Sequence, residues 1–292
     1  MALPRWEGEV AVSIADWGRM SRAERDAAYN NTAACPGGPA TMEALRAASA
    51  AFRAARPEHL DLAYGASQRE AWDLFPGAPG SDCLVFIHGG YWQRNDREGA
   101  AALMEGALAS GWSAALPGYT LAPEASLAAI VGQIHAAFDW LALHGAAHGI
   151  TGRIVAAGWS AGGHLAAMAL SHPAVSAALP ISGVFELGPL RDTYLNEKLS
   201  LTDDEIATLS PLRLPAPDKP MSIAYGSAEL PALIADSRAL HAQRAAQHRP
   251  GVLLPVPGAD HFTVLDALRR PGGALLGQAG ALLGQAGALL AP

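Results

Sequence analysis

Short apolar stretches alternate with longer segments of helix-forming residues along most of the chain. Each apolar stretch is six to eight residues long and ends in a turn or a glycine, which is typical of a buried strand. The stretches are CLVFIH (83–88), WSAALPGY (112–119), RIVAAG (153–158), AALPIS (177–182), MSIAYG (221–226) and VLLPVPG (252–258). Segments of helical length lie between most of them, at 98–110, 124–144, 161–171 and 232–248. This alternation predicts crossover connections and an α/β fold, with a mainly parallel central sheet and helices on both faces.

The first part of the chain has a different pattern. Residues 41–56, TMEALRAASAAFRAAR, begin with a threonine and consist largely of strong helix formers up to Pro57, so we predict a helix. Two short alternating stretches, LDLAY and EAWDLF, follow on either side of GASQR. They indicate an antiparallel hairpin that precedes the parallel strands.

The C-terminal segment, 273–292, repeats the sequence GALLGQA every seven residues. The repeat places leucine pairs at 275/276, 282/283 and 289/290, which predicts a helix with a leucine stripe. Each interior glycine costs such a helix up to about 1 kcal/mol relative to alanine, so the helix must dock on another surface. Docking on its own domain and a contact between two subunits, as in a homodimer, both satisfy that requirement.

Composition narrows the class of protein. Half of the 292 residues are hydrophobic and 16% are charged, a globular composition, and we expect one domain over 1–292, with the helical segment 1–57 contributing to a cap over the pocket. The net charge of −7 excludes a general nucleic-acid surface. No uninterrupted apolar run has the length of a membrane span, and the first residues lack the features of a signal peptide. We therefore expect a cytoplasmic protein without a membrane partner, whose two cysteines, Cys35 and Cys83, are free thiols.

A serine lies at the junction of a predicted strand and a predicted helix. Gly158-Trp159-Ser160-Ala161-Gly162 fits the pattern G-x-S-x-G, in which a sharp turn presents the serine hydroxyl above the sheet. The two glycines are needed because neighbouring chains approach closely at such a turn. Ser160 also lies near a helix N-terminus, which favours developing negative charge. A tight turn without a catalytic role would need the same two glycines. The assignment of Ser160 as a nucleophile therefore also requires catalytic partners elsewhere in the chain.

An alcohol is a weak nucleophile at neutral pH, so Ser160 needs a base, and the base needs a carboxylate that orients it. His261 follows the last predicted strand, VLLPVPGA, at the same strand ends as Ser160, and we take it as the general base. His164 lies one turn into the next helix and is expected to pack, and His88 is expected to brace the loop that follows it. His144 and His148 lack a third ligand, so no metal site is predicted.

The carboxylate should lie between the serine and the histidine in chain order, on a loop after the penultimate strand. The segment MSIAYGSAELPALIAD supplies Glu229, three residues after Gly226, and Asp236. Glu229 is better placed, because Asp236 falls within the predicted following helix. We therefore take Glu229 as the acid and keep Asp236 as the alternative.

The oxyanion of a tetrahedral intermediate needs hydrogen-bond donors, and losing one donor typically raises the barrier by about 2.7–4 kcal/mol. The sequence IHGGYWQ (87–93) follows a predicted strand, and Gly89 and Gly90 allow its N–H groups to enter the site. Together with the N–H of Ala161 they would form the hole.

These motifs resemble the α/β-hydrolase fold, and within it the hormone-sensitive-lipase-like esterases. HGGYWQ, GWSAGGHLAAM, ISGVFEL followed by SP at 210–211, and GADHF together resemble the arylformamidases, also called kynurenine formamidases. The similarity extends from LDLAYG to ADHF, and YNNTAACP (29–36) resembles the amino-terminal segment of bacterial relatives. The acid in that family is usually an aspartate in the pattern G-x-x-D, where this chain has GSAE.

The resemblance implies that Ser160 is the nucleophile, His261 the base and the HGG loop the oxyanion hole, without a cofactor. The expected activity is hydrolysis of a small ester or an N-formyl arylamide through an acyl-enzyme. Tyr91, Trp92 and Trp159 are candidates for the wall of an aromatic pocket, although each is equally compatible with packing. The unusual acid leaves an alternative, a binding protein of this fold without catalytic activity.

Overall fold

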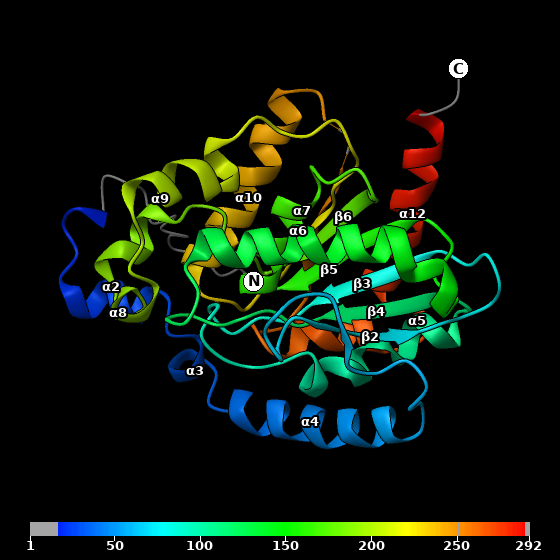
Figure 1. Cartoon of the computed structure of the whole chain (residues 1–292). Helices are drawn as coiled ribbons and strands as arrows, with labels where there is room; N and C mark the ends of the chain where they lie inside the picture. The colour runs from blue at the N-terminus through cyan, green and yellow to red at the C-terminus, as the bar shows by residue number, and fades with distance from the viewer. Residues whose placement is uncertain (1–16, 250, 290–292) are drawn as a thin grey trace, which may run out of the picture.

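The central sheet has eight strands and organises the rest of the molecule. A computed structural model describes residues 17–249 and 251–289, with strands in the order β1-β2-β4-β3-β5-β6-β7-β8 (Figure 1). The strands are β1 Leu62–Ala63, β2 Ala71–Phe75, β3 Cys83–Ile87, β4 Ser113–Pro117, β5 Ile154–Trp159, β6 Val175–Ile181, β7 Ile223–Gly226 and β8 Leu253–Val256. β1 and β2 form the predicted antiparallel hairpin, β2 is antiparallel to β4, and all other pairs are parallel. The predicted α/β fold with a mainly parallel sheet is confirmed.

Helices cover both faces of the sheet and enclose a separate apolar core on each side. The first core lies under α6 (Leu127–His144), α7 (Ala161–Ala169) and α10 (Pro231–Ala246). The second lies under α4 (Gly38–Ala54), α5 (Glu105–Ala109), α11 (Asp266–Arg269) and α12 (Ala274–Leu289). In Figure 1, α6 crosses the front of the sheet and α4 lies on the opposite side. The strands between these layers are buried on both faces, which explains why their sequences are continuous apolar runs.

The segment predicted as one helix over 98–110 consists of a 3-10 helix, Glu98–Met104, followed by α5. Several shorter helices were not predicted, namely α2 Arg22–Ala28, α3 Asn31–Ala34 and those between β6 and β7. The latter are the 3-10 helix Gly188–Asp192, α8 Asn196–Leu199, α9 Asp203–Leu209 and the 3-10 helix Pro211–Arg213. Together with α2 they lie at one end of the sheet, on the left in Figure 1.

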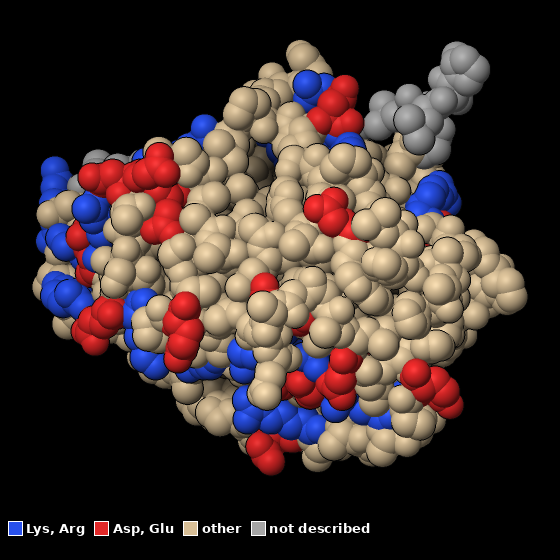
Figure 2. All heavy atoms as spheres, viewed as in Figure 1, with Lys and Arg blue, Asp and Glu red and all other residues tan. Residues whose placement is uncertain are grey.

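The long helix α6 meets the length and composition criteria of a membrane span. Over Leu127–His148 the mean hydropathy reaches 1.2, and this is the one such segment among the described residues. Its inner face, with Leu127, Ile130 and Ile134, is buried in the first core, and core helices of soluble proteins pass the same test, so this is weak evidence for a membrane span. On the molecular surface seen in Figure 2, charged side chains are sparse over the centre and gather towards the edges.

Helix α12 docks through the predicted leucine stripe. Leu275, Leu276, Leu282 and Leu283 are buried in the second core, and the third pair, 289/290, lies outside the residues whose side chains are described. The helix is also held by polar contacts, because Gln278 Nε2 donates to Ser222 Oγ over 2.9 Å. Docking on its own domain therefore satisfies the requirement of the glycine-rich helix, and a homodimer stays a prediction. Both cysteines are buried and free, as predicted.

Candidate active site

Ser160 lies in a strained turn between β5 and α7. Its φ of 56° and ψ of −119° are sparsely populated for a residue with a side chain, and such conformations are concentrated at functional sites. A Cβ on Gly158 would lie 2.0 Å from the carbonyl oxygen of Gly162, and one on Gly162 would lie 2.0 Å from that of Ile87. Both positions of the motif therefore require glycine, which confirms the reason given from the sequence.

His261 and Glu229 are joined by a buried hydrogen bond. His261 Nδ1 lies 2.9 Å from Glu229 Oε2, and the Glu229 carboxylate has no exposed surface. The other oxygen, Oε1, accepts a hydrogen bond from the backbone N–H of Gly226 over 2.6 Å and another from Ser182 Oγ. Because a carboxylate can only accept, the Nδ1 atom of His261 donates, which leaves Nε2 of a neutral imidazole as the acceptor.

Ser160 and His261 line the same pocket, which has a volume of about 250 Å³. Trp159, which precedes the serine, connects the two: its Nε1 donates to the carbonyl oxygen of His261 over 2.7 Å, and its ring centroid lies 4.9 Å from that of the imidazole. Each of Ser160 and His261 is only 2% exposed. The arrangement therefore combines a hydroxyl, an acceptor nitrogen and a buried carboxylate within one site whose polar groups are almost entirely buried.

The loop after β3 lies directly against Ser160. A Cβ on Gly89 would lie 2.5 Å from the carbonyl oxygen of Trp159 and 3.1 Å from Ser160 Cβ. The Gly89 carbonyl oxygen accepts hydrogen bonds from His88 Nδ1 (2.9 Å) and Asn95 Nδ2 (3.3 Å). The trans peptide then directs the N–H of Gly90 away from these two side chains.

Gly90 lines the pocket and has a φ of +115°, a conformation that favours glycine. Ala161 is the first residue of α7, so its N–H is one of those that have no acceptor within the helix. These amides and the Ser160 hydroxyl thus lie around one site.

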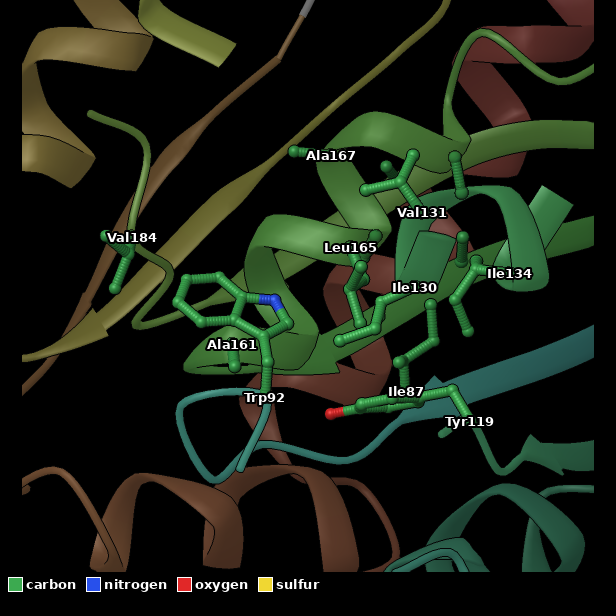
Figure 3. Close-up of a cluster of buried hydrophobic side chains, with 14 of the residues drawn as sticks. Ile87, Trp92, Tyr119, Ile130, Val131, Ile134, Ala161, Leu165, Ala167 and Val184 are labelled. Carbon is green, nitrogen blue, oxygen red and sulfur yellow. The ribbon is translucent and has the colours of Figure 1, made fainter. Parts of the chain in front are cut away.

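The structure separates the three aromatic residues that the sequence grouped as pocket wall. Tyr91 and Trp159 line the pocket. Trp92 does not: it is fully buried in the first core, edge-on to His164 with 5.1 Å between ring centroids. Figure 3 shows its indole among Ala161, Leu165 and Val184. The assignment of Trp92 to the substrate pocket is therefore wrong. The reason is that Tyr91 and Trp92 both have positive φ, so their side chains leave the loop in different directions.

The four other histidines considered from the sequence have structural contacts. His88 stacks on Tyr119, with 4.2 Å between ring centroids, and His164 Nε2 lies 2.7 Å from the carbonyl oxygen of Leu209. Burial lowers the pKa of each of these two imidazoles to about 4, so both are neutral at physiological pH. His144 and His148 lie beside Trp140. Among the described residues there is no group of three or more potential metal ligands.

Asp236, the alternative acid, lies away from His261. Its Oδ2 accepts hydrogen bonds from the backbone N–H groups of Phe185 (2.7 Å) and Glu186 (3.2 Å). Burial raises its pKa to about 7. The carboxylate that contacts the imidazole is that of Glu229.

Sequence reasoning missed several residues of the site. Ser182, which holds the Glu229 carboxylate, follows β6 with a φ of 51°, and its neighbours ISG gave no sign of that contact. Asn31, from α3, and Arg46, from α4, line the pocket together with Arg94, so the N-terminal segment forms part of its wall. The notable stretch YNNTAACP contains Asn31, but its sequence alone did not indicate a role.

The chain is similar in sequence to known hydrolases. A model of the family described as BD-FAE matches residues 77–177. The kynurenine formamidase of Danio rerio is 28% identical over 217 residues, which are 68% of this chain and 73% of that protein. The kynurenine formamidase of Salmo salar is 28% identical over 229 residues, or 72% of this chain and 76% of that protein.

Two solved structures are similar to this chain over most of its length. A Silicibacter sp. protein provisionally assigned as a thioesterase has a TM-score of 0.77 and 33% identity, and the match covers 88% of this chain and 99% of that one. Esterase B from Lactobacillus rhamnosis has a TM-score of 0.61 and 20% identity over 85% of this chain and 96% of its own, which shows a shared fold.

Proposed function

Because the chain belongs to the α/β-hydrolase family of esterases and arylformamidases, we propose that it is a serine hydrolase that cleaves a small ester or an N-formyl arylamide. The observation that carries this proposal is the buried contact between His261 Nδ1 and Glu229, in the pocket that contains Ser160. A carboxylate buried beside a histidine costs desolvation, and here it fixes the tautomer that acts as a base.

In the proposed reaction, Ser160 Oγ attacks the carbonyl carbon while His261 Nε2 takes its proton. The carbonyl π electrons move to the oxygen, where the N–H groups of Gly90 and Ala161 stabilise the negative charge. The intermediate collapses, His261 returns the proton to the departing oxygen or nitrogen, and the acyl group remains on Ser160. Water, deprotonated by His261, then attacks the acyl carbon and releases the acid and the free serine.

The aromatic wall of the pocket supports an aryl group as part of the substrate. Tyr91, Trp159 and Phe262 line it, and they offer flat apolar surfaces next to the serine. The kynurenine formamidase relatives favour an N-formyl arylamide, and the esterase neighbours favour an ester. The pocket volume of about 250 Å³ suits a small substrate of either kind.

The test is a Ser160→Ala variant assayed with p-nitrophenyl acetate and with a fluorophosphonate probe. We expect loss of turnover and of labelling, with an unchanged circular dichroism spectrum, and retained turnover would refute the proposal. Failure of the unmodified chain to react with the probe would instead favour a binding protein without catalytic activity. Comparing kcat/KM for N-formylkynurenine and for short-chain esters then decides between the two substrate classes.

A further inference from the structure

Asn31 lines the pocket and carries a buried hydrogen-bond acceptor that has no partner in the described part of the chain. The residue is 3% exposed and is the first of helix α3, within the stretch YNNTAACP. Its Nδ2 donates to Tyr91 Oη over 3.0 Å, whereas its Oδ1 is buried and has no partner in the described part of the chain. The pocket that it lines is the one that contains Ser160 and His261.

The hydrogen bonds of Tyr91 determine which end of the Asn31 amide remains unpaired. The tyrosine hydroxyl has a single hydrogen, and it donates this hydrogen to the carbonyl oxygen of Tyr29 over 2.6 Å. Burial raises the pKa of Tyr91, so the hydroxyl stays protonated and can only accept from Asn31. The amide must therefore present Nδ2 to Tyr91, and Oδ1 is the atom left without a donor.

The position of Asn31 is fixed by its surroundings. The preceding residue, Asn30, caps α3 by accepting a hydrogen bond from the N–H of Ala33 over 3.1 Å. On the other side, Tyr91 belongs to the loop that carries Gly89 and Gly90. Asn31 is thus held against the loop that carries the proposed oxyanion hole, and a specificity-determining side chain needs such a fixed position.

We propose that Asn31 Oδ1 accepts a hydrogen bond from an N–H group of the substrate, so that the pocket favours a substrate that carries this donor over an ester of the same shape. The inference rests on the proposed hydrolase function and concerns its substrate class. A buried polar group that loses its partner is costly, and a site built to pair with a substrate donor rejects the analogue that lacks it. An aryl ester leaves Oδ1 unpaired, whereas an N-formyl arylamide can pair it.

The experiment compares kcat/KM for three formyl compounds that would give the same acyl-enzyme. Phenyl formate has no N–H, formanilide has one at the scissile bond, and 4-acetamidophenyl formate has one on the ring only. For each N–H substrate, we divide its kcat/KM by that of phenyl formate. In Asn31→Leu we expect this ratio to fall about tenfold for one of the two N–H substrates, the effect of losing one hydrogen bond. The compound whose ratio falls identifies the position of the donor.

Two further variants separate recognition from support of the fold. Asn30→Ser keeps a capping residue on α3 and leaves the Asn31 side chain in place, so we expect both ratios to stay within twofold of those of the unmodified chain. Tyr91→Phe removes the hydroxyl that holds Nδ2 but keeps Oδ1. If Asn31 only supports Tyr91, both Tyr91→Phe and Asn31→Leu will lower kcat/KM for the three substrates by equal factors.

If Asn31→Leu lowers kcat/KM for all three substrates by the same factor, the inference is overturned and the proposed function remains intact. Absence of Ser160-dependent hydrolysis of all three compounds would refute the proposed function itself. If Asn31→Leu does not fold, Asn31→Ala serves in its place, because its side chain has no hydrogen-bond acceptor. The same fall in ratio is expected, and an unchanged ratio would again overturn the inference.

Discussion

Glu229 and His261 lie 32 positions apart in the chain, yet the carboxylate of one is 2.9 Å from the imidazole Nδ1 of the other. The acid of the arylformamidases that the motifs resemble is usually an aspartate, and Glu229 was the acid predicted for this chain. A tight turn after β7, in which the N–H of Glu229 donates to the Gly226 carbonyl, folds the longer glutamate back so that it also accepts from the N–H of Gly226. One carboxylate oxygen of Glu229 is thereby bound by the backbone while the other contacts His261.

Replacing Glu229 should have a large effect on the proposed catalysis. In Glu229→Gln the imidazole loses the carboxylate that fixes its tautomer and stabilises its protonated form, so we expect kcat for p-nitrophenyl acetate to fall about 10³-fold or more. Asp236→Asn is the matched control, with an expected change of less than about threefold. A large loss in the control and a small one in Glu229→Gln would show that Asp236 is the acid.

Ser182 positions the acid without touching the pocket. Its hydroxyl donates to Glu229 Oε1, and hydrogen bonds to charged groups contribute about 1.5–3 kcal/mol. We expect Ser182→Ala to lower kcat by about tenfold or more and to leave KM nearly unchanged. The exposed serine Ser171 provides the control, since Ser171→Ala removes only a hydrogen bond to the Met168 carbonyl. Equal steady-state kinetics in the two variants would contradict the role of Ser182.

The turn at Ser160 should not tolerate a methyl group. In Gly162→Ala the new Cβ would overlap the carbonyl oxygens of Ile87 and His88, at 2.0 and 2.6 Å, and we expect a loss of about 3 kcal/mol or more in the free energy of unfolding. In Gly277→Ala, on helix α12, no atom lies within 4 Å of the new Cβ. That change should stabilise the chain by up to about 1 kcal/mol. Urea denaturation measures both, and similar stabilities would contradict the packing described here.

Acid should destabilise the protein partly through His164. Burial lowers the pKa of His164 to about 4, below the usual 6.5, so on acidification the unfolded chain binds a proton that the folded chain excludes. The stabilising contribution is present above pH 6.5 and is lost as the pH falls towards 4. Between pH 7 and 4.5 this loss amounts to about 2 kcal/mol.

Between pH 7 and 4.5, the free energy of unfolding of His164→Gln should fall by about 2 kcal/mol less than that of the unmodified chain, because glutamine does not titrate. Denaturation at the two pH values measures the difference, in which the other titrating groups cancel. Parallel pH dependences of the variant and the unmodified chain would be incompatible with this prediction.

The sequence predicts the strands well and the segment between β6 and β7 poorly, for physical reasons. Strands such as Cys83–Ile87 are buried on both faces, so their apolar character is continuous and easily recognised. The helices of 188–213 have only three to seven residues, too few for a periodic pattern. The start of α9 carries a local signal, the capping box of Thr202 and Glu205, and two of the 3-10 helices have a proline in their first turn.

Residues of the site were predictable where a local motif dictates the backbone. The turn at Ser160 requires two glycines, and these are visible in the sequence. Trp92 was misassigned because its direction depends on two successive positive φ angles, which no side-chain pattern encodes. Asn31 and Ser182 were missed because their contacts join segments that are 60 and 47 positions apart, respectively.

The seven-residue repeat of α12 determines which deletions within this helix preserve its docking. Leu275/Leu276 and Leu282/Leu283 occupy equivalent places along one docking surface, and the side chain of Gln278 and the carbonyl of Leu283 anchor it to Ser222 and Arg153. Excision of residues 273–279 brings Leu282/Leu283 and Gln285 into the places of Leu275/Leu276 and Gln278. A deletion of seven residues therefore keeps the leucine pairs facing the sheet, whereas a deletion of two residues turns them by about 200°, away from it.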